Sequence, residues 1–436
     1  MLLNQRELFK LFAPLAVSGL FFPLARPIMN AAMARSENPE QALAAFAVAL
    51  SVTMPIISPL FALRQVTTAL SVDRDMLGRI RILTLALGGL STLLALIVAV
   101  PQVYDFVVIE TMGIPSDVAR IAAPVLLILA FSPLLSVGRG YYQGILVHYN
   151  KAGPIGTGAL VYVLAIAATL LIGHKFWSIE EAFLAAIASV VGQGFYIALV
   201  AIPSMPIIRT KMPAYRSELQ TSNRSHKYLF LFYLPLAVST LLGSIGEPAV
   251  LAAMARSAAP TASLAAFAVA GALGWLARTP LWNAQQVVIA QASSKSRYCE
   301  TRKFMIRMGA VSLCVLALLG GPGISDFVFS MIMGIEGESK ALAISGFRWM
   351  LPLIFLQAMR SLYHGVLIRM GRAQQIQYAT MAKMPMMALT LVLGVSYLDL
   401  EGIYIAIGST SISECVEILY LKRAVESIHW PDNEIS

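Results

Sequence analysis

Two short stretches of the sequence place an arginine beside other polar side chains at the spacing of one helical face. In "GRGYYQGIL", Arg139, Tyr142 and Gln143 stand at positions i, i+3 and i+4. The stretch "MRSLYHGVL" repeats this pattern with Arg360, Tyr363 and His364. Because a guanidinium binds a carboxylate or a phosphate with two parallel hydrogen bonds, both faces are candidates for capturing an anion.

Two further apolar segments carry neighbouring polar residues, namely Arg64, Gln65, Gln285 and Gln286. With the two arginine faces, these residues would make the cytoplasmic half of the protein's interior positive. We expect them to line a substrate pathway. The alternative, most applicable to Arg64, is that the long side chain reaches the lipid headgroups instead.

The first and seventh apolar segments each keep a charge beside a proline. Arg26 precedes Pro27, and Glu247 precedes Pro248. An ionisable group in hydrocarbon is costly, so it usually faces a partner or a water-filled cavity. We expect the two charges to meet across a central cleft, either as a gating or proton-sensitive pair or as a structural ion pair. A third alternative is that they never meet. The prolines favour movement, because a proline removes a helical hydrogen bond and bends the helix.

The other charges inside apolar segments are mostly cationic. The cations are Lys383, Arg278 and Arg348, and the acids are Glu247, Glu414 and Glu417. A pathway lined with an excess of cations should prefer an anion.

The elements that position these residues must be membrane helices. Charged residues are 13% of the 436, against about 25% in soluble domains, hydrophobic residues are 58%, and the mean hydropathy is +0.74. Twelve apolar segments are long enough to cross a bilayer: 11–33, 42–70, 82–104, 118–145, 154–173, 183–205, 230–254, 263–291, 305–322, 341–367, 376–396 and 402–421. They are expected to be helical, because lipid offers no hydrogen-bond partner and a helix satisfies all backbone N–H and C=O groups within one segment.

The chain contains two copies of one unit. "PLAVS" at 14–18, "AAMARS" at 31–36 and "LAAFAVA" at 43–49 each recur 221 residues later. With six segments in each copy, the halves share one orientation, and a pseudo-two-fold axis along the membrane normal should relate them. We therefore predict a six-helix bundle over 1–208, a basic cytoplasmic linker over 209–228 and a second six-helix bundle over 229–436.

The distribution of basic residues orients the chain. Twenty Lys and Arg residues fall in the termini and the loops after even-numbered segments, and four fall in the opposite loops. The positive-inside rule then places both termini in the cytoplasm of a multi-pass protein of the plasma (inner) membrane. The net charge of +9 is explained in this way, without a nucleic-acid partner.

The sequence lacks the motifs of catalysis and of cofactor binding. The five histidines and three cysteines have no metal-ligand spacing, and no phosphate-binding G-x-x-x-x-G-K-[ST] motif occurs. We expect no enzyme activity, no metal, no cofactor and no cleavable signal peptide. We also expect the protein to be a monomer.

Several of these motifs resemble a known group of proteins. The two parallel six-helix halves, the proline-bent first and seventh segments and the "P-L-A-x-S" openings resemble the multidrug/oligosaccharidyl-lipid/polysaccharide (MOP) exporter superfamily, which includes the MATE transporters. The stretches "RPIMN", "PLLSVGRGYYQGILVHYNK" and "MRSLYHGVLIRMGR" are similar to stretches of the progressive ankylosis protein family. The resemblance implies two bundles around a cleft, alternating access and export of citrate, nucleotides or pyrophosphate. It also implies an acid and an arginine on the first and seventh segments, which here stand in the reverse order.

Four functions are compatible with these features. The first is a secondary exporter of small anions, in which Arg139, Arg360 and Arg64 receive the substrate and Arg26 with Glu247 reports its presence. The second is an antiporter of cationic drugs coupled to H⁺ or Na⁺, with Glu247 as the proton site; the missing acid on the first segment counts against it. The third is a flippase for an anionic lipid-linked precursor, and the fourth a membrane scaffold or enzyme without transport. Membrane lipids are a partner in all four.

Overall fold

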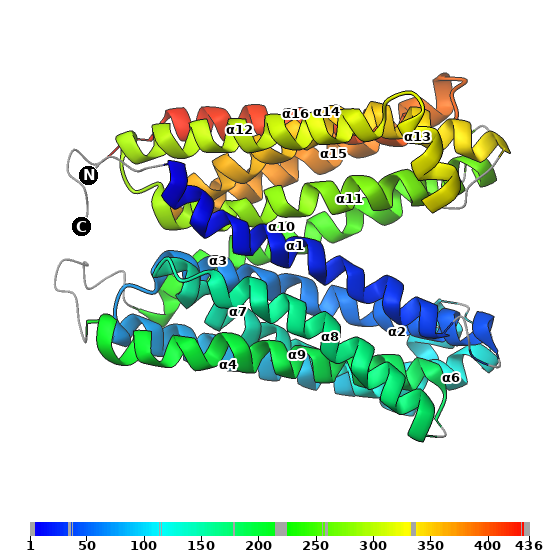
Figure 1. Ribbon diagram of the computed structural model, residues 1–436, viewed down its shortest axis with the longest axis horizontal. Helices are drawn as coiled ribbons and strands as arrows, with labels where there is room; N and C mark the ends of the chain where they lie inside the picture. Colours follow the sequence, from blue (N-terminus) through cyan, green and yellow to red (C-terminus); the bar gives the residue numbers. More distant parts are fainter. Residues whose placement is uncertain are drawn as a thin grey trace. The chain divides into compact units, whose positions relative to one another are not determined.

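The computed structural model describes residues 5–33, 36, 38–112, 114, 116–177, 179–213, 225–254, 256–257, 260–332, 337–428 and 430. Over these residues the regular elements are all helical (Figure 1). This confirms the predicted all-α membrane fold. Residues 214–224, which form most of the predicted linker, lie outside the described residues, and the three domain ranges stay a prediction.

Six long helical segments form the first half, two of them interrupted. In chain order the elements are α1 (Gln5–Met33), α2 (Pro39–Ile57), η1 (Ser58–Phe61), α3 (Ala62–Leu70), α4 (Arg74–Val98), α5 (Pro101–Tyr104), η2 (Asp105–Thr111), α6 (Ser116–Leu129), α7 (Ser132–His148), α8 (Gly153–Phe176), α9 (Glu181–Pro206) and η3 (Ile207–Lys211).

Six long helices also form the second half. They and their short extensions are α10 (His226–Met254), α11 (Pro260–Gln291), α12 (Lys295–Leu319), α13 (Ile324–Phe327), η5 (Val328–Ile332), α14 (Gly337–Arg369), α15 (Ala373–Tyr397) and α16 (Gly402–Glu426).

Most of these helices could cross a membrane. Ten helical segments in the described ranges are long and apolar enough, and an eleventh is added by α12 with the short helix after it, which bend by 77°. The remaining long helix, α11, coincides with the predicted segment 263–291. It is long enough at 32 residues but carries the polar stretch "RTPLWNAQQ".

The two halves repeat the same packing. A Cβ added at Gly144 would meet Thr67 at 2.5 Å, and one added at Gly365 would meet Val288, the equivalent of Thr67, also at 2.5 Å. The helices begin at equivalent residues too, since α4 starts at Arg74 and α12 at Lys295, 221 residues later. The repeat seen in the sequence therefore corresponds to the same helix packing inside each of the two halves.

The halves differ in the continuity of two helices. A 3₁₀ turn over Ser58–Phe61 separates α2 from α3, and a turn at Ala130 and Phe131 separates α6 from α7, whereas α11 and α14 run without a break. Pro59 lies in the first interruption and Pro133 just after the second, but Pro280, the equivalent of Pro59, lies within the unbroken α11, so proline alone does not cause the break.

The chain forms two compact units. One contains Ala13–Thr240 and the other Met1–Phe12 with Leu241–Ser436, so α1 and α10 each contribute to both. Within the first unit α8 packs on α9 and α3 on α7, and within the second α15 packs on α16 and α11 on α14.

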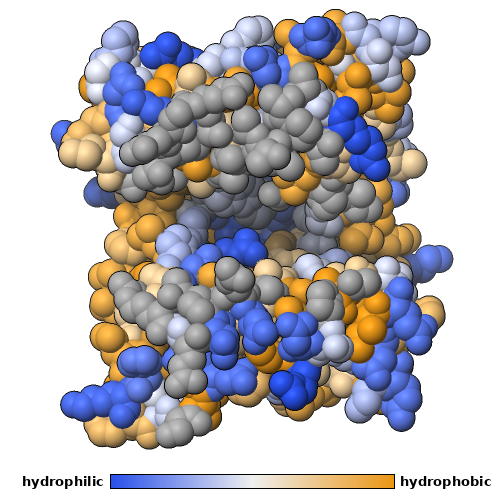
Figure 2. Space-filling model, turned by 90° about the vertical axis from the view of Figure 1, so that its right-hand side faces the viewer, coloured by the Kyte–Doolittle hydropathy of each residue, from blue (hydrophilic) through white to orange (hydrophobic). Residues whose placement is uncertain are grey.

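Apolar side chains also cover the outside of each unit, as expected of a surface in lipid. On α4 the exposed apolar side chains are Ile82, Leu85, Leu90, Leu93, Leu94 and Ile97. Figure 2 shows hydrophobic side chains along the margins of both units and many hydrophilic ones on the end of the helices that faces the viewer.

Candidate functional site

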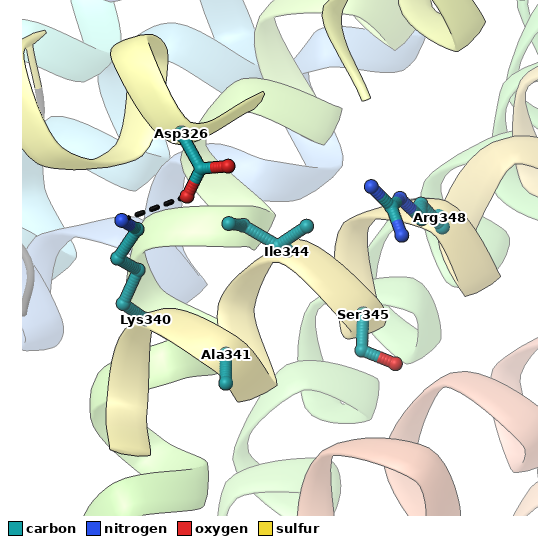
Figure 3. Close-up of a pocket in the computed structure, with 6 residues that line it drawn as sticks. All are labelled: Asp326, Lys340, Ala341, Ile344, Ser345 and Arg348. Carbon is teal, nitrogen blue, oxygen red and sulfur yellow. Dashed lines mark ion pairs between the residues drawn. The ribbon is translucent and has the colours of Figure 1, made fainter. Parts of the chain in front are cut away.

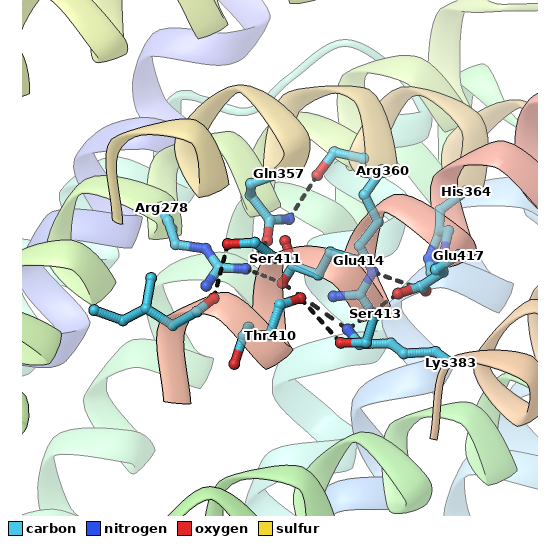
Figure 4. A network of polar contacts seen from close by, with 12 residues as sticks. Arg278, Gln357, Arg360, His364, Lys383, Thr410, Ser411, Ser413, Glu414 and Glu417 are labelled. Carbon is cyan, nitrogen blue, oxygen red and sulfur yellow. Dashed lines mark hydrogen bonds and ion pairs between the residues drawn. The ribbon is translucent and has the colours of Figure 1, made fainter. Parts of the chain in front are cut away.

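A buried carboxylate in the second unit is approached by three basic side chains. Glu417 on α16 is fully buried, and its Oε1 lies 2.9 Å from Arg360 Nε and 3.2 Å from His364 Nε2. Lys383 Nζ lies 3.1 Å from the other oxygen, Oε2. Figure 4 shows these side chains converging from α14, α15 and α16.

A second carboxylate lies one helical turn away. Glu414 accepts a hydrogen bond from Arg278 Nη2, and Lys383 Nζ lies 3.9 Å from its Oε1. Arg278 also donates to Gln357 Oε1 at 3.2 Å. Lys383, between the two carboxylates, joins both pairs into one network, which we call the C-bundle cluster: Arg278, Gln357, Arg360, His364, Lys383, Glu414 and Glu417 (Figure 4).

Helix geometry brings the cluster together. Glu414 and Glu417 are three residues apart on α16, and Arg360 and His364 are four apart on α14, so each pair shares one helix face. The members of such a buried network depend on one another, because removing one partner leaves an uncompensated charge.

The C-bundle cluster carries more positive than negative charge. Arg278, Arg360 and Lys383 are cations, and Glu414 and Glu417 supply two negative charges, so one positive charge is unmatched even with His364 neutral. Excess charge inside a membrane bundle calls for a counter-ion.

The first unit holds the equivalent positions with different residues. Counting back 221 residues, Arg360 becomes Arg139, His364 becomes Gln143, Lys383 becomes Tyr162 and Glu417 becomes Tyr196. Here the Gln143 amide donates to the hydroxyl of Tyr196, which is fully buried. The carboxylate at the centre of the C-bundle cluster is thus replaced by a phenol.

Aromatic rings surround Arg139 in the first unit. Its guanidinium carbon lies 4.9 Å from the ring centroid of Phe22 on α1, and that ring lies 4.7 Å from the ring of Tyr162 and 5.1 Å from the ring of Tyr196. The five side chains of Phe22, Arg139, Gln143, Tyr162 and Tyr196 form what we call the N-bundle site.

A second cation lies close to the N-bundle site. A Cβ added at Gly140 would lie 3.3 Å from the backbone nitrogen of Arg64, so α3 approaches α7 next to Arg139. Both arginine side chains are half-buried, and their like charges repel each other. This unit too holds positive charge between its helices.

Some of the predicted pathway residues belong to one of these two sites, and the others lie outside both. Arg139 and Gln143 belong to the N-bundle site, with Arg64 beside it, and Arg360 and His364 belong to the C-bundle cluster. The others are buried or half-buried on the same helices, Gln65 on α3, Tyr142 on α7, Gln286 on α11 and Tyr363 on α14.

The predicted charge pair on α1 and α10 remains untested. Arg26 and Pro27 are exposed side chains of α1. The side chains of Glu247 and Pro248 lie outside the described residues, so the pairing stays a prediction.

Sequence analysis did not assign some residues of the two sites a role. Arg278, Lys383, Glu414 and Glu417 stood out only as charges inside apolar segments. The spacing of three between the two glutamates was the available signal, since it places them on one helix face. Phe22, Tyr162 and Tyr196 gave no signal, because aromatic residues are common in membrane helices.

A separate pocket of about 340 Å³ lies near the N-terminal end of α14. Its lining residues are Asp326, Lys340, Ala341, Ile344, Ser345 and Arg348 (Figure 3). Lys340 Nζ pairs with Asp326 at 2.8 Å, and Arg348 Nε donates to the Gly320 carbonyl at 2.7 Å. Both cations that line this pocket therefore already have partners.

A metal site is not evident in the described part of the chain, where no group of three or more His, Cys, Asp and Glu side chains is placed to hold an ion. Long apolar helices in two repeated halves, with ionisable groups buried in each, define a multi-pass integral membrane protein. Solved structures similar to this fold include a MATE family transporter of the MOP superfamily and a second MATE transporter.

Three of these structures match the chain over nearly its whole length. An outward-facing multidrug resistance MATE family transporter of the MOP superfamily gives a TM-score of 0.78 at 15% identity, covering 97% of this chain and 96% of that one. A mutant of the Vibrio cholerae MATE transporter VcmN gives 0.78 at 18%, covering 98% of both chains. A MOP superfamily transporter from Pyrococcus furiosus, whose binding pocket is described as reversed in polarity, gives 0.76 at 13%, covering 97% and 96%.

The comparison of sequences gives no further assignment, since no protein-family model and no curated protein matches the chain. At these identities the structural likeness shows the fold. The closeness to progressive ankylosis proteins stays a prediction from the motifs.

Proposed function

We propose that this chain is a secondary-active exporter of small organic or phosphate-containing anions, similar to citrate, nucleotides or pyrophosphate. It works by alternating access in the plasma (inner) membrane, with both termini in the cytoplasm. The observation that carries this proposal is positive charge inside both units: Arg139, which forms no ion pair within the described residues, in one, and an unmatched cation among Arg278, Arg360 and Lys383 in the other.

The physical reason lies in the cost of unmatched charge. A positive site between membrane helices repels a cationic solute and attracts an anion, whose charge then replaces the missing counter-charge. The fold shared with MATE transporters supports transport as the activity.

The same fold does not fix the charge of the substrate. The Pyrococcus furiosus structure is described by a binding pocket of reversed polarity, and that description suggests a different function for that protein. An anion substrate for this chain is consistent with such variation.

The alternative of a cationic drug antiporter coupled to H⁺ or Na⁺ would need a carboxylate available for the cation. Glu414 and Glu417 are buried carboxylates, yet Arg278, Arg360 and Lys383 already neutralise them. The flippase alternative would use the same arginines for a lipid-linked phosphate.

The test is transport by the purified protein in liposomes. Uptake of radiolabelled citrate, ATP and pyrophosphate would be compared with uptake of a fluorescent cationic drug, under an imposed H⁺ or Na⁺ gradient and without one. We expect uptake of at least one anion above that of empty liposomes. Uptake of the drug alone would overturn the proposal, and movement of a fluorescent anionic lipid between leaflets would favour the flippase.

A further inference from the structure

The internal repeat lets the second unit act as a reference for the first. Arg360 and Arg139 are equivalent residues of one repeated fold, and one of the differences between their surroundings concerns the acid that pairs with the arginine. Arg360 has the carboxylate of Glu417 at 2.9 Å, whereas Arg139 has the phenol Tyr196 at the equivalent position. The first unit therefore keeps the arginine and lacks its acid.

Between Gln41 and Glu181, no acid lies in the middle of a helix of the first half. Between Gln41 and Glu181 the acidic residues are Asp73, Asp75, Asp105, Glu110, Asp117 and Glu180, all at or beyond helix ends. In the described residues, Arg139 forms no ion pair, and its guanidinium lies over the Phe22 ring. A cation–π contact attracts the guanidinium to the ring but supplies no full negative charge to balance it.

We propose that the carboxylate of a small organic anion binds at Arg139 and supplies the charge that Glu417 supplies to Arg360. This inference rests on the proposed function and deepens it, because it assigns the receiving site to one unit and names the chemical group that is recognised.

The groups around Arg139 fit a carboxylate. The guanidinium donates two parallel hydrogen bonds to a planar group, and the Gln143 amide and the tyrosine hydroxyls add neutral donors. Arg139 is only half-buried, so part of its surface is accessible. The C-bundle cluster, in contrast, already holds two carboxylates of its own, Glu414 and Glu417.

The decisive variant is Gln143→Glu. The two side chains have almost the same shape, and a glutamate can accept a hydrogen bond from the Tyr196 hydroxyl, so the local packing is kept. The new carboxylate stands four residues after Arg139 on one helix face and neutralises it from within the protein. The matched control is Gln102→Glu, the same change at an exposed residue of α5.

Binding of radiolabelled citrate to the full-length protein in detergent measures the effect. We expect Gln143→Glu to weaken binding at least about tenfold and Gln102→Glu by less than about threefold, at similar melting temperatures. Arg139→Gln should lose binding equally, and it replaces the first variant if Gln143→Glu fails to fold. Wild-type binding by both variants would overturn the inference.

Competition separates the ligand classes, and transport separates the two proposals. Succinate should displace citrate more strongly than inorganic phosphate or chloride does, and displacement by phosphate alone would reject the carboxylate. If liposomes with the wild-type protein take up citrate, and liposomes with Gln143→Glu or Arg139→Gln take it up equally, this inference fails and the proposed function stands. If wild type neither binds nor transports any anion but moves the cationic drug, both fail.

Discussion

Glu417 lies 2.9 Å from Arg360 in the fully buried interior of the second unit, and its equivalent in the first unit is Tyr196. The same backbone framework thus holds a completed ion pair in one half and an arginine without its acid in the other. This difference gives two otherwise similar arginines opposite expected phenotypes.

Glu417→Gln should destabilise the protein strongly. The change leaves Arg360 and Lys383 without their shared carboxylate, and breaking a buried pair costs about 3–5 kcal/mol. The free energy of unfolding in detergent would measure it. The control is Glu426→Gln at the exposed end of α16, for which we expect a change within about 0.5 kcal/mol. Equal stability of the two variants would show that the C-bundle cluster is not structural.

Arg139→Ala and Arg360→Ala should differ in stability. The first removes a half-buried cation that contacts a ring, at about 1 kcal/mol or less. The second strands Glu417 in the interior and should cost several times more. Thermal unfolding of both variants, with citrate binding in parallel, checks this. A larger loss of stability for Arg139→Ala would mean that Arg139 is the structural arginine.

Gly144→Ala and Gly365→Ala should each destabilise by about 1–3 kcal/mol, because the added methyl group would meet a neighbouring side chain at 2.5 Å. Gly194→Ala is the control, since a Cβ there meets nothing within 4 Å, and alanine favours a helix by about 0.5–1 kcal/mol. Melting temperatures should fall for the first two variants and stay level or rise for the third. Unchanged melting in Gly144→Ala or Gly365→Ala would mean that the helices can separate there at no cost.

The Arg26 and Glu247 charges should be coupled if they meet. Arg26→Glu with Glu247→Arg would then restore more transport than either single change, because opposite charges would again face each other. The measurement is a double-mutant cycle on anion uptake in liposomes. Strictly additive losses would mean that the two charges act independently.

Much of the fold was predictable because it follows from patterns that a sequence displays directly. The apolar segments predicted the membrane helices, and the 221-residue repeat predicted equivalent packing in each half. The eighth segment was the least certain, since the polar stretch within α11 reduces its apolar character.

The sites were only partly predictable, because they depend on contacts between different helices. Arg139 with Gln143 and Arg360 with His364 were found through their spacing on a single helix. The repeat compares equivalent residues, so it could not show that Glu417 on α16 lies against Arg360 on α14, where the first half has a tyrosine. Distances between helices come only from the folded structure.

The interrupted helices have a mechanical consequence. The 3₁₀ turn at Ser58–Phe61 and the turn at Ala130 and Phe131 break the regular hydrogen-bond ladder in the first unit only, while α11 and α14 are continuous. A helix bends most easily where its ladder is already broken. The two repeats therefore differ in elasticity. Bending within the first unit is expected to concentrate at these two breaks, on the helices that carry Arg64 and Arg139.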